Sequence, residues 1–287
     1  MASRRIDPAL KAALIRLGVF ASIAIVTYIV SSMALFWLLG KGEMLVIAIA
    51  SNFTAAAMAS AISLRVFERG QLADIGLGWN NASRRNLIVG LLGGIGAALV
   101  VLLVPVAFRV ASIHPAPGQH FEWTNLVYFT LIFAFGAIAE EMLFRGYGFQ
   151  VFMKGSGPFG AILPFSLLFA FTHANNPAFG LLPFLNTLFW GVLLGYSFLC
   201  SGDLWLPIGL HFGWNWVLPM LGDNLSGLTM RMTGYTMDWK IGGLWSGGAY
   251  GVEGGLLTTL IIVLLFLYLR KAPVHPQEPY LLYKDRA

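Results

Sequence analysis

Three short stretches of the sequence, EEMLFR, FAFTH and HFGWN, carry ionisable or amide side chains between apolar neighbours. Their polar members of interest are Glu140, Glu141, Arg145, His173, His211 and Asn215. Ionisable groups inside apolar segments are energetically costly and usually mark function. A carboxylate and imidazoles that meet in one cavity can move protons to and from a bound water, so the combination predicts general acid–base chemistry.

Helical spacing separates the two adjacent glutamates. Glu141 and Arg145 are four residues apart, so they share one face of a helix and can form an ion pair. Glu140 is rotated by about 100° from Glu141 and has no partner within its own helical turn. We therefore expect Glu141 and Arg145 to be supporting residues and Glu140 to be the reactive carboxylate.

The composition indicates the elements that must position these residues. Of the 287 residues, 57% are hydrophobic and 11% are charged, whereas about 25% of a soluble domain is charged. The chain is therefore predicted to be a polytopic membrane protein. Its basic residues fall between apolar runs and not on one folded face, so no nucleic-acid partner is expected. The single cysteine, Cys200, excludes an internal disulfide and a cysteine-based zinc site.

The predicted fold is all-α, a bundle of about eight transmembrane helices in the lipid bilayer. The expected spans are 13–39, 43–64, 87–113, 123–153, 159–174, 178–200, 204–222 and 255–270. The chain then divides into N-terminal helices, a catalytic core, a Gly-rich outer loop, and a last helix with a tail; the ranges are 1–120, 121–222, 223–254 and 255–287. The polar, Pro-containing tail is expected to be flexible.

Lysine and arginine counting predicts the orientation of this bundle, because cytoplasmic loops are enriched in these residues. With the N-terminus inside, the inner segments hold thirteen of them: Arg4, Arg5, Lys11, Arg16, Arg65, Arg69, Arg84, Arg85, Lys154, Arg270, Lys271, Lys284 and Arg286. The outer loops hold Lys41, Arg231 and Lys240, and Arg109 lies near an outer helix end. Both termini are therefore expected to be cytoplasmic, and the membrane to be the cell membrane of a prokaryote.

A hairpin argument places the polar residues at one depth. The segment GSGP at 155–158 predicts the turn between the fourth and fifth helices. Glu140 and His173 each lie 15 residues from this turn, so both should sit about 22 Å from it. The following ANNPAFG breaks the helix, which is tolerated at that depth only beside protein or a water-filled cavity. The seventh helix can bring His211 and Asn215 into the same cavity.

Together the three motifs resemble those of a known family. EExxxR is matched in EEMLFR, FxxxH in FAFTH and HxxxN in HFGWN, and the matching residues are Glu140, Glu141, Arg145, Phe169, His173, His211 and Asn215. The chain resembles the CAAX-protease and bacteriocin-processing (CPBP or Abi) intramembrane proteases, which include Rce1-type prenyl-protein endopeptidases. The resemblance covers about residues 123–220.

The resemblance implies hydrolysis of peptide bonds in membrane-associated peptides or proteins, either CAAX-type or leader-peptide processing. Glu140, with His173 beside it, would activate a water. His211 and Asn215 would donate hydrogen bonds to the developing oxyanion. The glutamate–arginine pair would brace Glu140, or Arg145 would bind a substrate carboxylate.

Alternatives remain at this stage. In the preferred mechanism there is no metal cofactor. In the alternative, Glu140, His173 and His211 bind Zn²⁺ as a His₂Glu set, although the HExxH helix typical of such sites is absent. A non-enzymatic bacteriocin-immunity or membrane scaffold protein could use the same cavity. A transporter is disfavoured because the chain shows no duplicated halves with matching broken helices.

Overall fold

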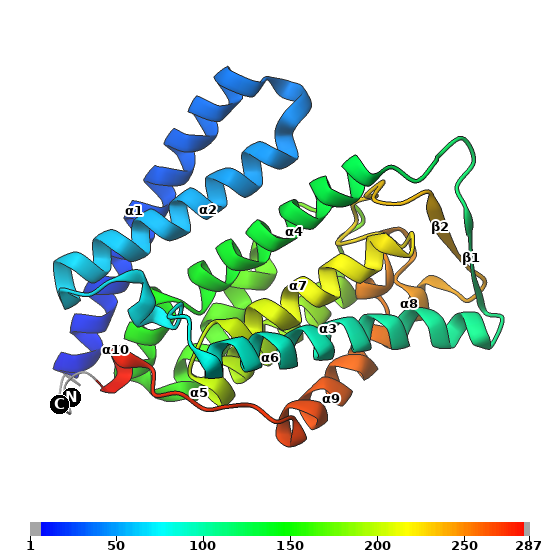
Figure 1. Ribbon diagram of the computed structural model, residues 1–287. Coiled ribbons are helices and arrows are strands. Elements are labelled where there is room, and N and C mark those ends of the chain that lie inside the picture. Colours follow the sequence, from blue (N-terminus) through cyan, green and yellow to red (C-terminus); the bar gives the residue numbers. More distant parts are fainter. Residues whose placement is uncertain (1–6, 284–287) are drawn as a thin grey trace, which may run out of the picture.

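Helices make up most of the chain, and the computed structural model describes residues 7–283. The long helices are α1 Pro8–Leu39, α2 Met44–Ser63, α3 Asn81–Ala107, α4 Trp123–Phe144, α5 Tyr147–Thr172, α6 Leu181–Ser201, α7 Trp205–Met220 and α9 Leu256–Lys271 (Figure 1). The short helices are α8 Gly243–Ser246 and α10 Tyr280–Tyr283. The predicted all-α class is confirmed. One small antiparallel pair of strands was not predicted, β1 Ala111–Pro115 with β2 Tyr235–Trp239.

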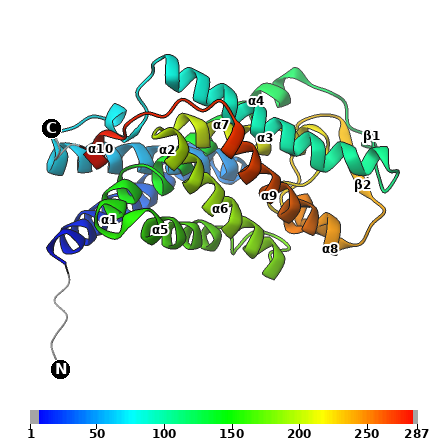
Figure 2. The same cartoon turned by 90° about the horizontal axis from the view of Figure 1, so that it is seen from below.

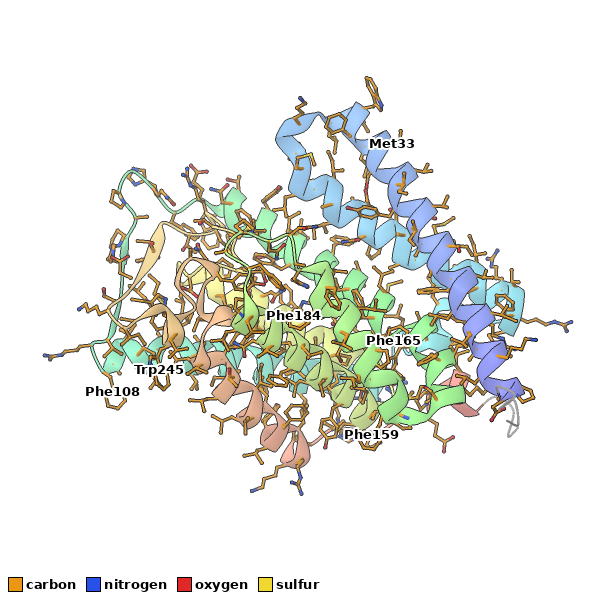
Figure 3. All side chains as sticks on the ribbon, turned by 180° about the vertical axis from the view of Figure 1, so that it is seen from behind. Met33, Phe108, Phe159, Phe165, Phe184 and Trp245 are labelled. Atoms are coloured by element: carbon orange, nitrogen blue, oxygen red, sulfur yellow. The ribbon has the colours of Figure 1, made fainter. Side chains whose placement is uncertain are left out.

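Five helical segments of the described chain are long and apolar enough to cross a membrane: Pro8–Leu39, Lys41–Glu68, Asn81–Ala107, Trp123–Thr172 and Leu181–Ser201. α7 and α9 have 16 residues each, about 24 Å, which is less than a bilayer core of about 30 Å. Large apolar side chains such as Met33, Phe108 and Phe159 are exposed on the outside of the bundle (Figure 3). The chain is therefore an integral membrane protein, and the count of eight spans stays a prediction.

The turn predicted at GSGP is found as a kink in the helix, and a second interruption precedes it. α4 and α5 are separated only by Arg145 and Gly146. GSGP lies inside α5, where Gly157 has φ 75° and ψ 169° and kinks the helix. A glycine adopts this positive φ without a steric cost. Gly and Pro in sequence are compatible with a turn or with a kink, and packing decides between the two.

The segment after α9 is docked on the bundle, so the expectation of a flexible tail is wrong for its described part. The His275 backbone N–H donates to Asn86 Oδ1 (2.8 Å), and Asn86 Nδ2 donates to the His275 carbonyl oxygen (2.9 Å). The Gln277 N–H donates to the Ser201 carbonyl oxygen (2.7 Å). These bonds satisfy the buried amide of Asn86. The last four residues lie outside the described chain.

The helices α3 and α7 approach each other so closely that only glycine fits between them. A Cβ on Gly90 would lie 2.3 Å from the Leu206 carbonyl oxygen, and one on Gly94 would lie 2.2 Å from that of Leu210. Two glycines of α7 meet the backbone of α3 in the same way. Small residues allow this kind of close backbone packing between membrane helices. The contact fixes α7, which carries the HFGWN motif.

We expect Gly94→Ala to destabilise the protein by about 1–3 kcal/mol, because the added methyl group must push the two helices apart. Gly96→Ala is the matched control on the same helix, since no heavy atom lies within 4 Å of its Cβ position. It should be neutral, or stabilising by up to about 1 kcal/mol through helix propensity. Thermal unfolding in detergent measures both, and equal melting temperatures would contradict the packing argument.

Candidate active site

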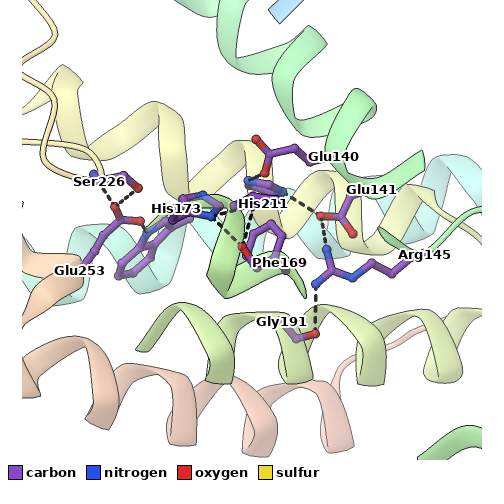
Figure 4. Close-up of polar contacts among 11 residues, drawn as sticks. Glu140, Glu141, Arg145, Phe169, His173, Gly191, His211, Ser226 and Glu253 are labelled. Atoms are coloured by element: carbon purple, nitrogen blue, oxygen red, sulfur yellow. Dashed lines mark hydrogen bonds and ion pairs between the residues drawn. The ribbon is translucent and has the colours of Figure 1, made fainter. Parts of the chain in front are cut away.

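Glu141 is the centre of a buried polar chain that joins three helices. Its Oε1 accepts a hydrogen bond from Arg145 Nη1 (3.1 Å) and another from His211 Nδ1 (2.8 Å) (Figure 4). Arg145 Nη2 donates to the carbonyl oxygen of Gly191 on α6 (3.0 Å). Glu141 is 0% exposed and Arg145 1%. The predicted ion pair along α4 is therefore present, and it also orients the imidazole on α7.

Arg145 is held by an aromatic ring as well as by its hydrogen bonds. Its guanidinium carbon lies 4.8 Å from the centre of the Phe169 ring, a cation–π contact. Phe169 is itself buried. Arg145 is buried and lines neither the cavity nor the adjoining pocket, so its position favours a bracing role over binding of a substrate carboxylate.

Glu140 has a different environment, although it is the adjacent residue. Its side chain is 24% exposed, and its Oε2 lies 3.7 Å from His211 Nε2, which is beyond hydrogen-bonding distance. That oxygen has no hydrogen-bond partner in the described part of the chain. His211 thus lies between two carboxylates, with Nδ1 bonded to Glu141 and Nε2 toward Glu140.

His173 comes directly after the last residue of α5, where the helix was expected to break. Its Nδ1 lies 2.9 Å from the Phe169 carbonyl oxygen. A carbonyl oxygen only accepts hydrogen bonds, so the geometry assigns the proton to Nδ1 and leaves the lone pair of the neutral ring on Nε2. His173 is therefore arranged to accept a hydrogen bond through Nε2.

A cavity of about 650 Å³ connects these groups. Glu140, His173 and Asn215 all line it, and a small adjoining pocket is lined by His173, His211 and Asn215. Glu140 and His173 thus line one cavity, as the hairpin argument predicted. Neither Glu141 nor Arg145 lines the cavity. The predicted residues therefore form two layers, one beside the cavity and one buried behind it.

The zinc alternative does not fit the side chains as they are arranged. Among residues 7–283, no three His, Cys, Asp or Glu side chains form a group that could hold a metal ion. No step of the chemistry proposed below therefore involves zinc.

Sequence reasoning missed a further carboxylate at the site, Glu253 in the Gly-rich loop. Glu253 Oε1 accepts from Trp214 Nε1 (2.8 Å), and Oε2 accepts from the backbone N–H (2.7 Å) and the hydroxyl (2.8 Å) of Ser226. Glu253 and Ser226 line the small pocket together with His173 and His211. The only signal was one acidic residue in GVEGG. The loop that was expected to lie outside the site forms part of its wall.

Asp223, at the start of the same loop, joins two distant parts of it through hydrogen bonds. Its Oδ1 accepts from Trp239 Nε1 (2.9 Å) and its Oδ2 from the Val252 N–H (2.8 Å). Burial raises the pKa of Asp223 to about 6. Asn186 of α6 donates to the carbonyl oxygens of Glu253 and Gly255, both at 2.8 Å. These polar residues hold the loop in place.

We expect the two adjacent glutamates to differ in their effect on stability. Glu141→Gln removes the carboxylate that faces the buried Arg145, which should cost about 3–5 kcal/mol. Glu140→Gln, the same change one residue earlier, should stay within roughly 0.5 kcal/mol because its oxygen has no such partner. Thermal unfolding in detergent compares the two variants. Equal destabilisation by both would contradict the two-layer arrangement.

A comparison with known proteins agrees with this geometry. No curated protein and no solved structure matches the chain. The family model described as type II CAAX prenyl endopeptidase Rce1-like matches residues 122–217, about a third of the chain. The matched segment includes every residue from Glu140 to Asn215. The segment that carries all three motifs is therefore similar to the Rce1-like family of type II CAAX prenyl endopeptidases.

Proposed function

We propose that the chain is an intramembrane endopeptidase in which Glu140 activates the attacking water. The difference between the two adjacent glutamates carries this assignment. Glu141 is buried and bonded to Arg145 and His211, whereas Glu140 lines the cavity and its nearest charged partner in the described chain is His211, at 3.7 Å. A carboxylate that is open to a cavity and free of strong partners can take a proton from water.

In the proposed reaction, a water oxygen attacks the carbonyl carbon of the scissile peptide bond. Glu140 accepts one proton from that water as the new C–O bond forms. The same proton then passes to the leaving nitrogen when the C–N bond breaks, so the carboxylate is regenerated. His173 supports the step by accepting a hydrogen bond from the second O–H of the water through Nε2. Its Nδ1–H is already bonded to the Phe169 carbonyl oxygen.

The tetrahedral intermediate carries a negative oxygen that needs hydrogen-bond donors. Asn215 lines both the cavity and the small pocket, and its amide can donate in any protonation state of the site. His211 Nε2 donates only when both ring nitrogens are protonated, because Nδ1 already carries the proton shared with Glu141. Each such donor contributes about 10²–10³ in rate. We therefore assign Asn215 as the constant donor and His211 as the conditional one.

The substrate proposed for this site is a peptide segment of a membrane-associated protein. The cavity volume of about 650 Å³ falls within the range of about 300–1,000 Å³ that is usual for ligand sites. Apolar residues of α2 and α4, including Ile49, Ile132 and Phe133, form its walls. An extended apolar peptide fits these walls, and the match of residues 122–217 to an endopeptidase family supports cleavage of such a peptide.

Glu140→Gln and His173→Ala should each lower the cleavage rate by about 10²-fold or more, because general acid–base groups contribute about 10²–10⁴. Glu122→Gln is the matched control, since this exposed glutamate precedes α4 and its side chain does not cap the helix. Purified protein in liposomes is tested on fluorogenic peptides with and without a prenyl group. Full cleavage by both site variants would contradict the proposal.

We expect the enzyme to work without a bound metal. Protein purified in a strong chelator should contain less than one zinc per chain and keep its full rate on the same peptides. The reason is that no three His, Cys, Asp or Glu side chains among residues 7–283 form a group that could hold a metal ion, and that a carboxylate beside an imidazole can activate a water without one. Metal analysis together with the rate measures this. Loss of activity in chelator that returns when Zn²⁺ is added would support the zinc mechanism instead.

A further inference from the structure

The two ends of the bundle can be told apart by their contacts. Arg16 at the start of α1 pairs with Glu68 at the end of the helical segment that follows α2 (2.6 Å), and the docked tail contacts the start of α3. We call this the terminal end. The α1–α2 turn, the β1–β2 pair and α8 lie at the opposite end (Figures 1 and 2). The loop 173–180 also lies at this opposite end, because Gly227 of the Gly-rich loop packs on the carbonyl oxygen of Pro177.

The cavity opens toward the opposite end. It is lined by the first half of α2, near the α1–α2 turn, by the loop that follows α5, and by residues 225–230. The exposed residues at its edge include Thr172, Ala174 and Asn175. Toward the terminal end, the way is closed by fully buried side chains, namely Glu141, Arg145, Tyr147 and Gln150. A peptide therefore cannot reach Glu140 from the terminal end, whereas the lining residues lie toward the end that carries the Gly-rich loop.

The basic residues of the described chain are distributed unequally between the two ends. The terminal end holds nine: Lys11, Arg16, Arg65, Arg69, Arg84, Arg85, Lys154, Arg270 and Lys271. The opposite end holds four: Lys41, Arg109, Arg231 and Lys240. Loops rich in lysine and arginine stay on the cytoplasmic side. This bias places the terminal end in the cytoplasm and the mouth of the cavity outside.

The polar residues that line the cavity indicate whether it binds an internal segment of a polypeptide or its C-terminus. Four asparagines line it, Asn52, Asn175, Asn176 and Asn215, and their amides can both donate to and accept from a peptide backbone. No lysine or arginine is among the described residues that line the cavity. A free C-terminal carboxylate would therefore find no cation there, whereas an internal segment needs none.

We infer that the active-site cavity opens to the non-cytoplasmic face of the membrane. Its substrates are then internal segments of exported or membrane-anchored polypeptides on that face, and not cytoplasmic C-terminal tails. The choice of substrate rests on the proposed endopeptidase function. The direction of the opening does not, because it follows from the cavity lining and the charge bias alone.

Cysteine labelling tests the direction of the opening without any substrate. The single cysteine, Cys200, is replaced by serine. His120→Cys reports on the opposite end, Asn81→Cys on the terminal end and Ala174→Cys on the mouth of the cavity; all three positions are exposed. A membrane-impermeant maleimide should label His120→Cys and Ala174→Cys in intact cells, and Asn81→Cys only after permeabilisation.

The inference is overturned if Ala174→Cys behaves like Asn81→Cys, if it is labelled under neither condition, or if the two end reporters are reversed. A second measurement compares new protein N-termini in cells that express the wild type or Glu140→Gln. Cleavage sites in internal segments on the exported side support the inference. Sites in cytoplasmic segments or at extreme C-termini overturn it but leave the endopeptidase proposal standing. If no site differs, the endopeptidase proposal fails as well, and the substrate choice fails with it.

Discussion

The buried carboxylate of Glu141 is the group on which the arrangement of the site depends. A charge without solvent is tolerated only when its partners are fixed around it. Here one oxygen is shared by Arg145 and His211, and Arg145 in turn reaches Gly191. The helices α4, α6 and α7 are thereby joined at one point. Because the same contact holds the His211 proton on Nδ1, it also sets which nitrogen faces the cavity.

The site shows how helix geometry gives different roles to adjacent identical residues. Glu140 and Glu141 differ by one residue, or about 100° of rotation. That rotation puts one side chain among buried partners and the other beside a cavity of about 650 Å³. The glycine-mediated contact of α3 with α7 keeps this division fixed, because α7 cannot turn without a backbone clash at Gly90 and Gly94.

Local spacing was enough to predict part of this site, and contacts distant in sequence account for the rest. The Glu141–Arg145 pair follows from four-residue spacing, and the helix end at His173 follows from the Asn, Pro and Gly residues after it. The role of Glu253 could not be read in the same way, because its partner Ser226 is 27 residues away in a segment without helical periodicity. The docking of the segment after α9 could not be predicted for the same reason. Its polar residues do not show that their partner is Asn86, far away in the sequence.

The bonds of Glu253 have a consequence for protein engineering. The carboxylate joins Ser226 to Trp214 of α7 through hydrogen bonds, so the segment between α7 and α9 forms part of the wall of the small pocket. A chimera that exchanges only this segment between homologues would rebuild this part of the wall while leaving all three motifs intact. Module boundaries for recombination therefore belong before α7 and after the start of α9, so that these hydrogen-bonded residues are transferred as one unit.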